Sequence, residues 1–230
     1  MATKIIVSYD GTDNDHDALA LGSLLAGPRG DLELAYVRHA HEAQTGRERL
    51  VEKDAEALLA GGAEVIGRPD IPQHVVLSAS TPEGLRTLVV DEHASVIVFG
   101  SEYRTAKGHV DPQASARRLL DGGPGAVAIA PAGFADVQGY EVASIVAVGE
   151  EGDPCALETA ESLAARSGAT VSVGTSRDVG GSPDFLVVGS RSGTVTGRVT
   201  LSAAAEYLIE LARCPVLVLP RGVAVSFANL

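Results

Sequence analysis

The sequence contains few of the residues that mark many classes of protein. Among 230 residues there is no tryptophan, and there are only four phenylalanines, five tyrosines, one methionine and two cysteines. Cys155 and Cys214 lie far apart without metal-site spacing, which indicates reduced, packed thiols of a cytosolic protein. With so few aromatic side chains, the core must be built from valine, alanine, leucine and glycine. These small side chains suit helices packed closely on a sheet.

Positive charge and long apolar runs are also scarce. Eighteen Lys and Arg face thirty Asp and Glu, which gives a formal net charge of −12. Such a surface repels phosphate backbones and anionic lipids, so we expect neither nucleic acid nor a membrane as a partner. No apolar run is long enough to span a bilayer, and "MATKIIVSYD" enters a strand almost directly, without a secretory leader. We therefore expect a cytoplasmic protein.

An internal repeat is the most informative feature of the chain. "SVIVFGS" (95–101) resembles "DFLVVGS" (184–190), and "GPGAVAIAP" (123–131) resembles "ARCPVLVLP" (212–220). Pro131 follows Gly100 by 31 positions, and Pro220 follows Gly189 by the same 31. Equal spacing between two matched pairs indicates a duplicated unit.

The repeat extends toward the N-terminus of each copy. "IIVSYDGTDNDHDALALGSLLAG" resembles "IVAVGEEGDPCALETAESLAARSG", since each reads as a strand, an acidic turn and a helix. The second copy lacks roughly fifty residues that in the first copy predict a helix, the strand "QHVVLSA" and a helix that starts at Thr81.

The alternation of strands and helices predicts an α/β fold, with parallel strands covered by helices on both faces. Residues 1–135 are expected to form a five-stranded domain. Residues 140–230 are expected to form an abridged copy that lacks one strand and about two helices. The tail "GVAVSFANL" alternates like a short edge strand, and the strand "ATVSVGTS" is left with an exposed edge.

These segments resemble the universal stress protein (UspA-like) family in tandem form, across nearly the whole chain. The resemblance rests on "IIVSYDGTDNDHDAL", the two apolar runs that end in Gly-Ser, and "RCPVLVLP". It implies open parallel sheets of the adenine-nucleotide-alpha-hydrolase-like fold. It also implies ATP at the carboxyl ends of the strands in the members that bind it, with the last strands of the two copies adjacent.

The family's ATP motif is Gly, two residues, Gly, nine residues, then Gly-Ser or Gly-Thr. Carried onto the first copy, the sugar-binding Asp is Asp10, followed by Gly11 and Thr12, and Val37 would line the base. The phosphate loop would begin at Gly100. Its later positions hold Tyr103, Gln113 and Ala114 in place of glycine and serine. The first copy therefore keeps the Asp and loses the phosphate loop.

In the second copy the loop would begin at Gly189 and Ser190. Ser192 stands at the second glycine, although Gly193 follows, and Ser202 stands at the third glycine. Val148 occupies the Asp position. Because each family site is built within one domain, neither copy has a complete site. Losing two or three hydrogen bonds to a charged ligand, at about 1.5–3 kcal/mol each, would turn a micromolar site into a millimolar one or weaker.

Three other patterns have competing interpretations. His39 and His41 could share a face of a strand and bind a metal, or simply face solvent. The acidic run 10–17 resembles a cation loop, but helix capping explains it better. Arg104, Lys107 and His109 could form an anion pocket near Asp10, although an ordinary surface loop is the simpler interpretation.

The sequence favours a non-catalytic regulatory or interaction protein that carries degenerate nucleotide sites and no cofactor. We expect self-association, as a pseudo-dimer within the chain and as a homodimer, and an unidentified protein partner. One alternative is a stress sensor that binds ATP or another adenine nucleotide. Another is a weak ATPase or nucleotidyl-transfer enzyme, for which the sequence offers no general base near a phosphate loop.

Overall fold

The computed structural model describes residues 3–39, 48–150, 152–175 and 182–227, and in helix α2 the side chains from residue 53 onward. The strands are β1 (Lys4–Ser8), β2 (Asp31–His39), β3 (Gln73–Ser78), β4 (Val96–Phe99), β5 (Ala126–Ile129), β6 (Ser144–Val148), β7 (Thr170–Val173), β8 (Phe185–Val188) and β9 (Val216–Val218). The helices are α1 (Asp13–Ala26), α2 (Glu48–Val65), α3 (Thr81–Asp91), α4 (Ala114–Leu120), the short 3₁₀ helix η2 (Phe134–Asp136), α5 (Cys155–Ser167) and α6 (Ala203–Leu211).

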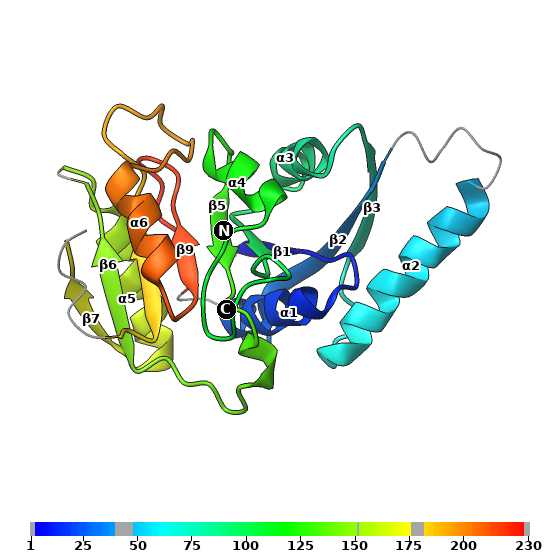
Figure 1. The fold of residues 1–230 in the computed structure, drawn as a ribbon, viewed down its shortest axis with the longest axis horizontal. Coiled ribbons are helices and arrows are strands. Elements are labelled where there is room, and N and C mark those ends of the chain that lie inside the picture. Colours follow the sequence, from blue (N-terminus) through cyan, green and yellow to red (C-terminus); the bar gives the residue numbers. More distant parts are fainter. Residues whose placement is uncertain (1–2, 40–47, 151, 176–181, 228–230) are drawn as a thin grey trace.

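All nine strands join one sheet in the order β3-β2-β1-β4-β5-β9-β8-β6-β7. Every neighbouring pair is parallel except β5 and β9, which are antiparallel, with Ala128 opposite Leu217. The α/β fold is thus confirmed, as is the adjacency of the two last strands. Because the two halves run in opposite directions, their carboxyl edges lie at opposite ends of the sheet (Figure 1).

Helices cover both faces of the sheet. One core cluster packs α1, α2 and α5 on one face, and the other packs α3, α4 and α6 on the opposite face. The central strands β4, β5, β8 and β9 are buried along their whole length. This explains why they read as continuous apolar runs rather than as alternating patterns.

In the part of the second half that the structure describes there are four strands and two helices. Strand β7 forms an outer edge of the sheet, as expected from its sequence. The prediction that residues 222–230 add an edge strand is wrong for the residues that the structure describes. Residues 223–227 form no ladder, and they lie along α5 instead. The amides of Val225 and Phe227 donate to the hydroxyls of Thr159 and Ser162. Phe227 is fully buried, so the tail belongs to the core.

Two contacts tie the halves together on the α1 and α5 face. The guanidinium of Arg166 in α5 donates to the carbonyl oxygens of Leu24 and Leu25 at the end of α1, at 2.7 and 2.5 Å. A helix C-terminus carries partial negative charge, which a nearby cation stabilises. Because α1 has no basic residue in its own last turn, Arg166 of the other half provides the positive charge. The guanidinium also lies 5.6 Å from the ring centre of Phe227.

The segment between the halves is held by a carboxylate of α1. Asp17 is 3 % exposed and accepts hydrogen bonds from the amides of Gly133 and Ala135 in the turn around η2. Burial raises the pKa of Asp17, and these two amides oppose that rise. Residues 133–135, just before the predicted division of the chain, are therefore held against α1. The division of the chain at residues 135 and 140 itself remains a prediction.

Candidate functional site

The loops that follow β4 and β8 have the same backbone hydrogen bonds, displaced by 89 positions. The amide of Glu102 donates to the carbonyl of Asp111, and Arg191 donates to Thr200 in the same way, at 2.8 and 2.9 Å. Gly108 donates to Ala132 after β5, and the equivalent Gly197 donates to Arg221 after β9, both at 2.8 Å. The stretch "GSRSGTVTG" therefore folds as the same hairpin as "GSEYRTAKG".

A buried serine hydroxyl anchors each hairpin. Ser101 and Ser190 are both fully buried. Each hydroxyl donates at 2.7 Å to a carbonyl just after the last strand of its half, Ala130 or Leu219. Each also accepts from an amide ten residues further on, that of Asp111 or Thr200. The Ser190 hydroxyl, expected to contact phosphate, is thus engaged inside the protein.

The turn after β1 binds a carboxylate of its own chain. Asp15, 4 % exposed, accepts the amide of Asp10 at 2.6 Å and that of Thr12 at 3.4 Å. Burial raises the pKa of Asp15 to about 8, and the neighbouring Asp10 adds to the rise. The Asp10 side chain is exposed and accepts the amide of Thr12 at 3.2 Å. The amides of Asp10 and Thr12 therefore already donate to a carboxyl group of the chain itself.

Two predicted glycines of the first half, Gly11 and Gly100, are closely packed against atoms of other elements. Gly11 has a φ of +82°, which favours glycine, and a Cβ there would lie 2.5 Å from Leu58 of α2. A Cβ on Gly100 would lie 2.0 Å from the Asn14 carbonyl oxygen. Packing thus accounts for both glycines.

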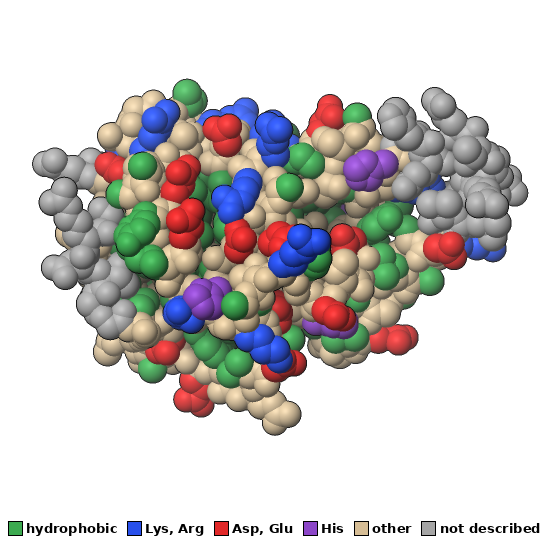
Figure 2. All heavy atoms as spheres, in the orientation of Figure 1, with side chains coloured by type: hydrophobic (Ala, Val, Ile, Leu, Met, Phe, Trp, Pro, Cys, Tyr) green, Lys and Arg blue, Asp and Glu red, His purple; other side chains and the backbone are tan. Residues whose placement is uncertain are grey.

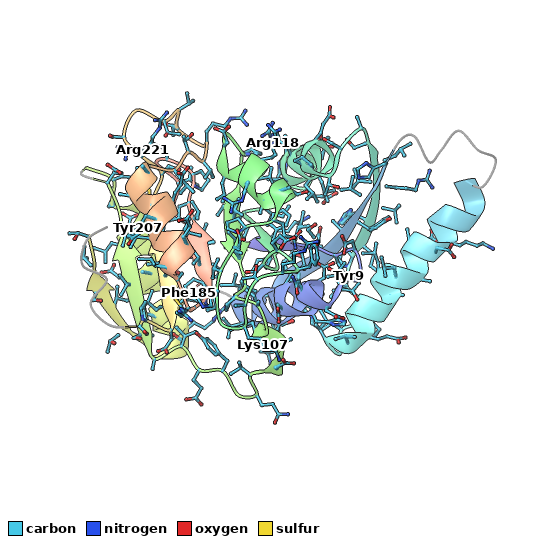
Figure 3. All side chains as sticks on the ribbon, viewed as in Figure 1. Tyr9, Lys107, Arg118, Phe185, Tyr207 and Arg221 are labelled. Carbon is cyan, nitrogen blue, oxygen red and sulfur yellow. The ribbon has the colours of Figure 1, made fainter. Side chains whose placement is uncertain are left out.

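The aromatic and aliphatic positions near this edge face helices. Val37, expected to line a base, is buried beneath α3, where a Cβ on Gly84 would lie 2.9 Å from it. Tyr9, just after β1, packs against Gly62 of α2, where an added Cβ would lie 2.9 Å from the tyrosine ring. The ring lies between the sheet and that helix (Figure 3). The structure brings Asp10, Gly11 and Gly100 to one edge of the sheet but packs Val37 away from solvent.

The predicted residues of the second half are more open. Gly189 lies beside Gly149, with only ordinary contacts for an added Cβ. Ser192 and Gly193 are exposed in a turn, and Gly193 has a φ of +83°. Ser202 caps α6, since its hydroxyl accepts the Ala205 amide at 3.3 Å.

Asp153, in the turn before α5, is bound to the chain that follows β9. Asp153 accepts the amide of Gly222 at 3.2 Å and pairs with the Arg221 guanidinium at the same distance. Burial opposes the charged form of Asp153, but its hydrogen bonds and Arg221 leave its pKa lowered. Figure 3 shows Arg221 near the 190–198 loop. A cation at this edge is therefore present but already paired.

The side chains of the alternative sites contact different partners among the described residues. Lys107 pairs with Asp136 at 2.7 Å, and Arg104 stacks on the Tyr103 ring, so the two do not converge on an anion pocket. His39 contacts the Thr81 hydroxyl at 3.3 Å, and His41 lies outside the described residues. Asp15 forms a capping box with Thr12 at the start of α1, as the capping interpretation requires. Asp17 instead accepts amides of the segment between the halves.

Both cysteines are packed thiols, as the sequence indicated. They are reduced and buried, and burial raises the pKa of Cys155 and of Cys214 to about 12. A thiol with a raised pKa carries little thiolate and is a poor nucleophile.

Sequence reasoning missed one group of side chains. Glu33 lies on β2 in a buried stretch and pairs with Lys4 and His74, and Glu92 pairs with the same lysine. This cluster lies at the opposite edge of the first half from Asp10. A charged residue in the apolar run "DLELAYV" was the available signal, because a buried carboxylate requires partners.

The described surface is mixed in charge. Figure 2 shows Lys and Arg side chains interspersed with Asp and Glu on the face that it presents. Within the described ranges, none of the helices combines the length and apolar character needed to cross a bilayer.

The fold is an open α/β sheet with helices on both faces, and similar folds are found among solved structures. No protein-family model and no curated protein matches the sequence. The structure is similar to a functionally unknown protein from Pseudomonas aeruginosa PAO1, at 14% identity and a TM-score of 0.67, over 96% of this chain and 93% of that one.

Two further structures carry the name of a family. A protein assigned as a universal stress protein, from Pseudomonas aeruginosa UCBPP-PA14, matches at 15% identity and a TM-score of 0.66, over 96% of this chain and 94% of its own. A universal stress protein from Archaeoglobus fulgidus DSM 4304 matches at 16% identity and a TM-score of 0.58, over 96% and 100%. The chain therefore has the universal stress protein fold.

Proposed function

We propose that the chain is a tandem universal stress protein that acts as a non-catalytic regulatory or interaction protein in the cytoplasm. In this proposal the loops after β4 and β8 are structural remnants of nucleotide sites. The fold supports the family assignment, because the likeness extends over almost the whole chain.

The observation that carries the proposal is the position of the serine hydroxyls in the two Gly-Ser pairs, at Ser101 and Ser190. Both serine hydroxyls are buried and bound to the chain just after the last strand of their half. A phosphate held by either serine hydroxyl would have to break these bonds, and each buried group left unpaired would cost about 1–3 kcal/mol. Asp15 adds to this in the first half, because its carboxylate binds the amides of Asp10 and Thr12.

The competing function is a nucleotide sensor that uses the second half. It is favoured by one observation, since Ser192 and Gly193 form an exposed turn that a phosphate could reach. Against it stands the pairing of Arg221 with Asp153, which removes a nearby cation from phosphate binding.

Isothermal titration of ATP, with and without Mg²⁺, into protein shown by absorbance to carry no nucleotide tests the proposal. We expect no binding heat up to millimolar ATP. Heat that fits a micromolar site would overturn the proposal. If it disappears in Ser192→Ala and persists in Asp10→Ala, the second half is the sensor. Disappearance only in Asp10→Ala would place the site in the first half.

A further inference from the structure

A cluster of charged side chains lies at the amino-terminal edge of β1, β2 and β3. Lys4 begins β1, Glu33 lies on β2, His74 lies on β3, and Glu92 follows the last residue of α3. The predicted nucleotide positions of the first half lie at the opposite edge, toward the carboxyl ends of β1, β2 and β4, and those of the second half follow β8. None of them belongs to the cluster. The cluster is therefore separate from the proposed function and does not depend on it.

The side chains of the cluster make short contacts with one another. The Lys4 ammonium lies 3.0 Å from Glu33 Oε1 and 2.8 Å from Glu92 Oε2. His74 Nε2 lies 2.7 Å from Glu33 Oε2. One ligand atom each from Glu33, His74 and Glu92 can be chosen so that all three lie within 4.8 Å of one another. Three elements of secondary structure thus direct metal-ligating atoms to one point.

The charges of this cluster favour a cation between the carboxylates. The Glu33 side chain is only 4 % exposed, and a buried carboxylate is costly unless a positive group or a metal balances it. Two carboxylates converge on the single ammonium of Lys4 and, with the opposing effect of burial, leave its pKa raised to about 12.

From this geometry we propose that Glu33, His74 and Glu92 bind a first-row divalent metal ion, which replaces the ammonium of Lys4. One imidazole nitrogen and two carboxylate oxygens suit Zn²⁺, Mn²⁺, Fe²⁺ or Co²⁺ better than Mg²⁺ or Ca²⁺, which prefer oxygen alone.

The exchange requires only side-chain movement. The Lys4 and Glu92 side chains are 20 % and 34 % exposed, so the lysine can turn into solvent and the glutamate can close on the ion. A divalent ion brings two positive charges to the two carboxylates, whereas the ammonium of Lys4 brings one. His74 must be neutral to act as a ligand, so binding weakens in acid.

Co²⁺ is the probe that tests the site, because its visible absorption reports nitrogen and oxygen ligands directly. The full chain is stripped of metal with a chelator and titrated at neutral pH. We expect an absorption band that saturates at one equivalent and disappears when Zn²⁺ is added. His74→Ala and Glu92→Gln should each weaken binding by about tenfold or more. Lys4→Met should strengthen it by a similar factor, because the competing ammonium is gone.

His39→Ala is the matched control, since His39 lies at the carboxyl end of β2, away from the cluster. It should bind Co²⁺ like the unchanged protein. Circular dichroism shows whether each variant is folded, and Glu92→Gln, at a partly exposed position, is the variant expected to perturb the fold least. Three results would overturn the proposal. These are no saturating band in the unchanged chain, a band that survives both ligand substitutions, and binding only in Lys4→Met, which would leave the cluster as ion pairs alone.

Discussion

Asp15 shows how one side chain can determine the chemistry of a loop. Its carboxylate is held by the amides of Asp10 and Thr12, yet burial raises its pKa to about 8. The folded protein therefore keeps the proton of Asp15 at pH values where the unfolded chain, with a pKa near 3.8, has lost it. A salt-bridged carboxylate with a lowered pKa makes the protein more stable as pH rises, whereas a carboxyl group with a raised pKa makes it less stable as pH rises.

The pH dependence of stability follows from this sign. Between the two pKa values the folded state binds more protons than the unfolded state, so the contribution of Asp15 to the free energy of unfolding falls as pH rises from about 4 to about 8. In Asp15→Asn, which keeps an acceptor oxygen, we expect a flatter profile and higher stability than the unchanged chain above pH 8. Urea unfolding at a series of pH values measures it. Parallel profiles for the two proteins would contradict this role.

At the residue scale, the sequence predicted positions better than roles. It placed Asp10, Gly100 and Gly189 at strand ends, because apolar runs that end in glycine mark those ends clearly. It could not reveal that Ser190 is buried, since the partners of its hydroxyl lie 29 and 10 residues away in the chain. It also missed the partners of Glu33, which come from three separate elements. Long-range partners leave no local pattern in a sequence.

At the scale of elements, the C-terminal tail is the clearest difference from expectation. The alternation of Val223, Val225 and Phe227 was interpreted as an edge strand. Burial does alternate around Ser226, which is exposed between the buried Val225 and Phe227, but Val223 is exposed. The hydrogen-bonding partner is different, because hydroxyls of α5 accept the tail amides. A period of two specifies an extended chain with one buried face, but not what covers that face.

The tail should therefore contribute strongly to stability. Phe227→Ala removes a fully buried ring from beside Arg166, and we expect it to lower the free energy of unfolding by about 3–5 kcal/mol. Denaturant unfolding measures the change. Val223→Ala, at a position that is 39% exposed, is the control and should shift it by less than about 0.5 kcal/mol. Equal, small effects for both substitutions would show that the tail is not part of the core.

At the scale of the whole molecule, the antiparallel pair β5 and β9 makes one sheet from two halves. The alternation of strands and helices in each half could be anticipated, because the repeat has equal spacing and its strands are strongly apolar. That the two copies share one continuous sheet depends on the pairing of Val127, Ala128 and Ile129 with β9, which no local pattern specifies.

Separating the two halves should remove the pairing of β5 with β9 and leave the edge of β5 open. A fragment of residues 1–139 would leave β5 as a buried apolar strand with an open edge, and such edges pair with other chains. We expect the fragment to form dimers or larger aggregates, as judged by size-exclusion chromatography with light scattering. The full chain, measured alongside, shows whether association is specific to the cut edge. A folded, monomeric fragment would mean that β9 is dispensable to the first half.

The antiparallel junction also bears on how the two loops came to differ. Since the halves point in opposite directions, the hairpin after β4 and the hairpin after β8 emerge from opposite ends of the sheet. A substitution in one hairpin is therefore remote from the other, and only the serine anchor and the framework of backbone hydrogen bonds must persist in each. Two copies that began alike could thus drift independently in charge and bulk, with "EYRTAK" in one and "RSGTVT" in the other, while the scaffold between them remained unchanged.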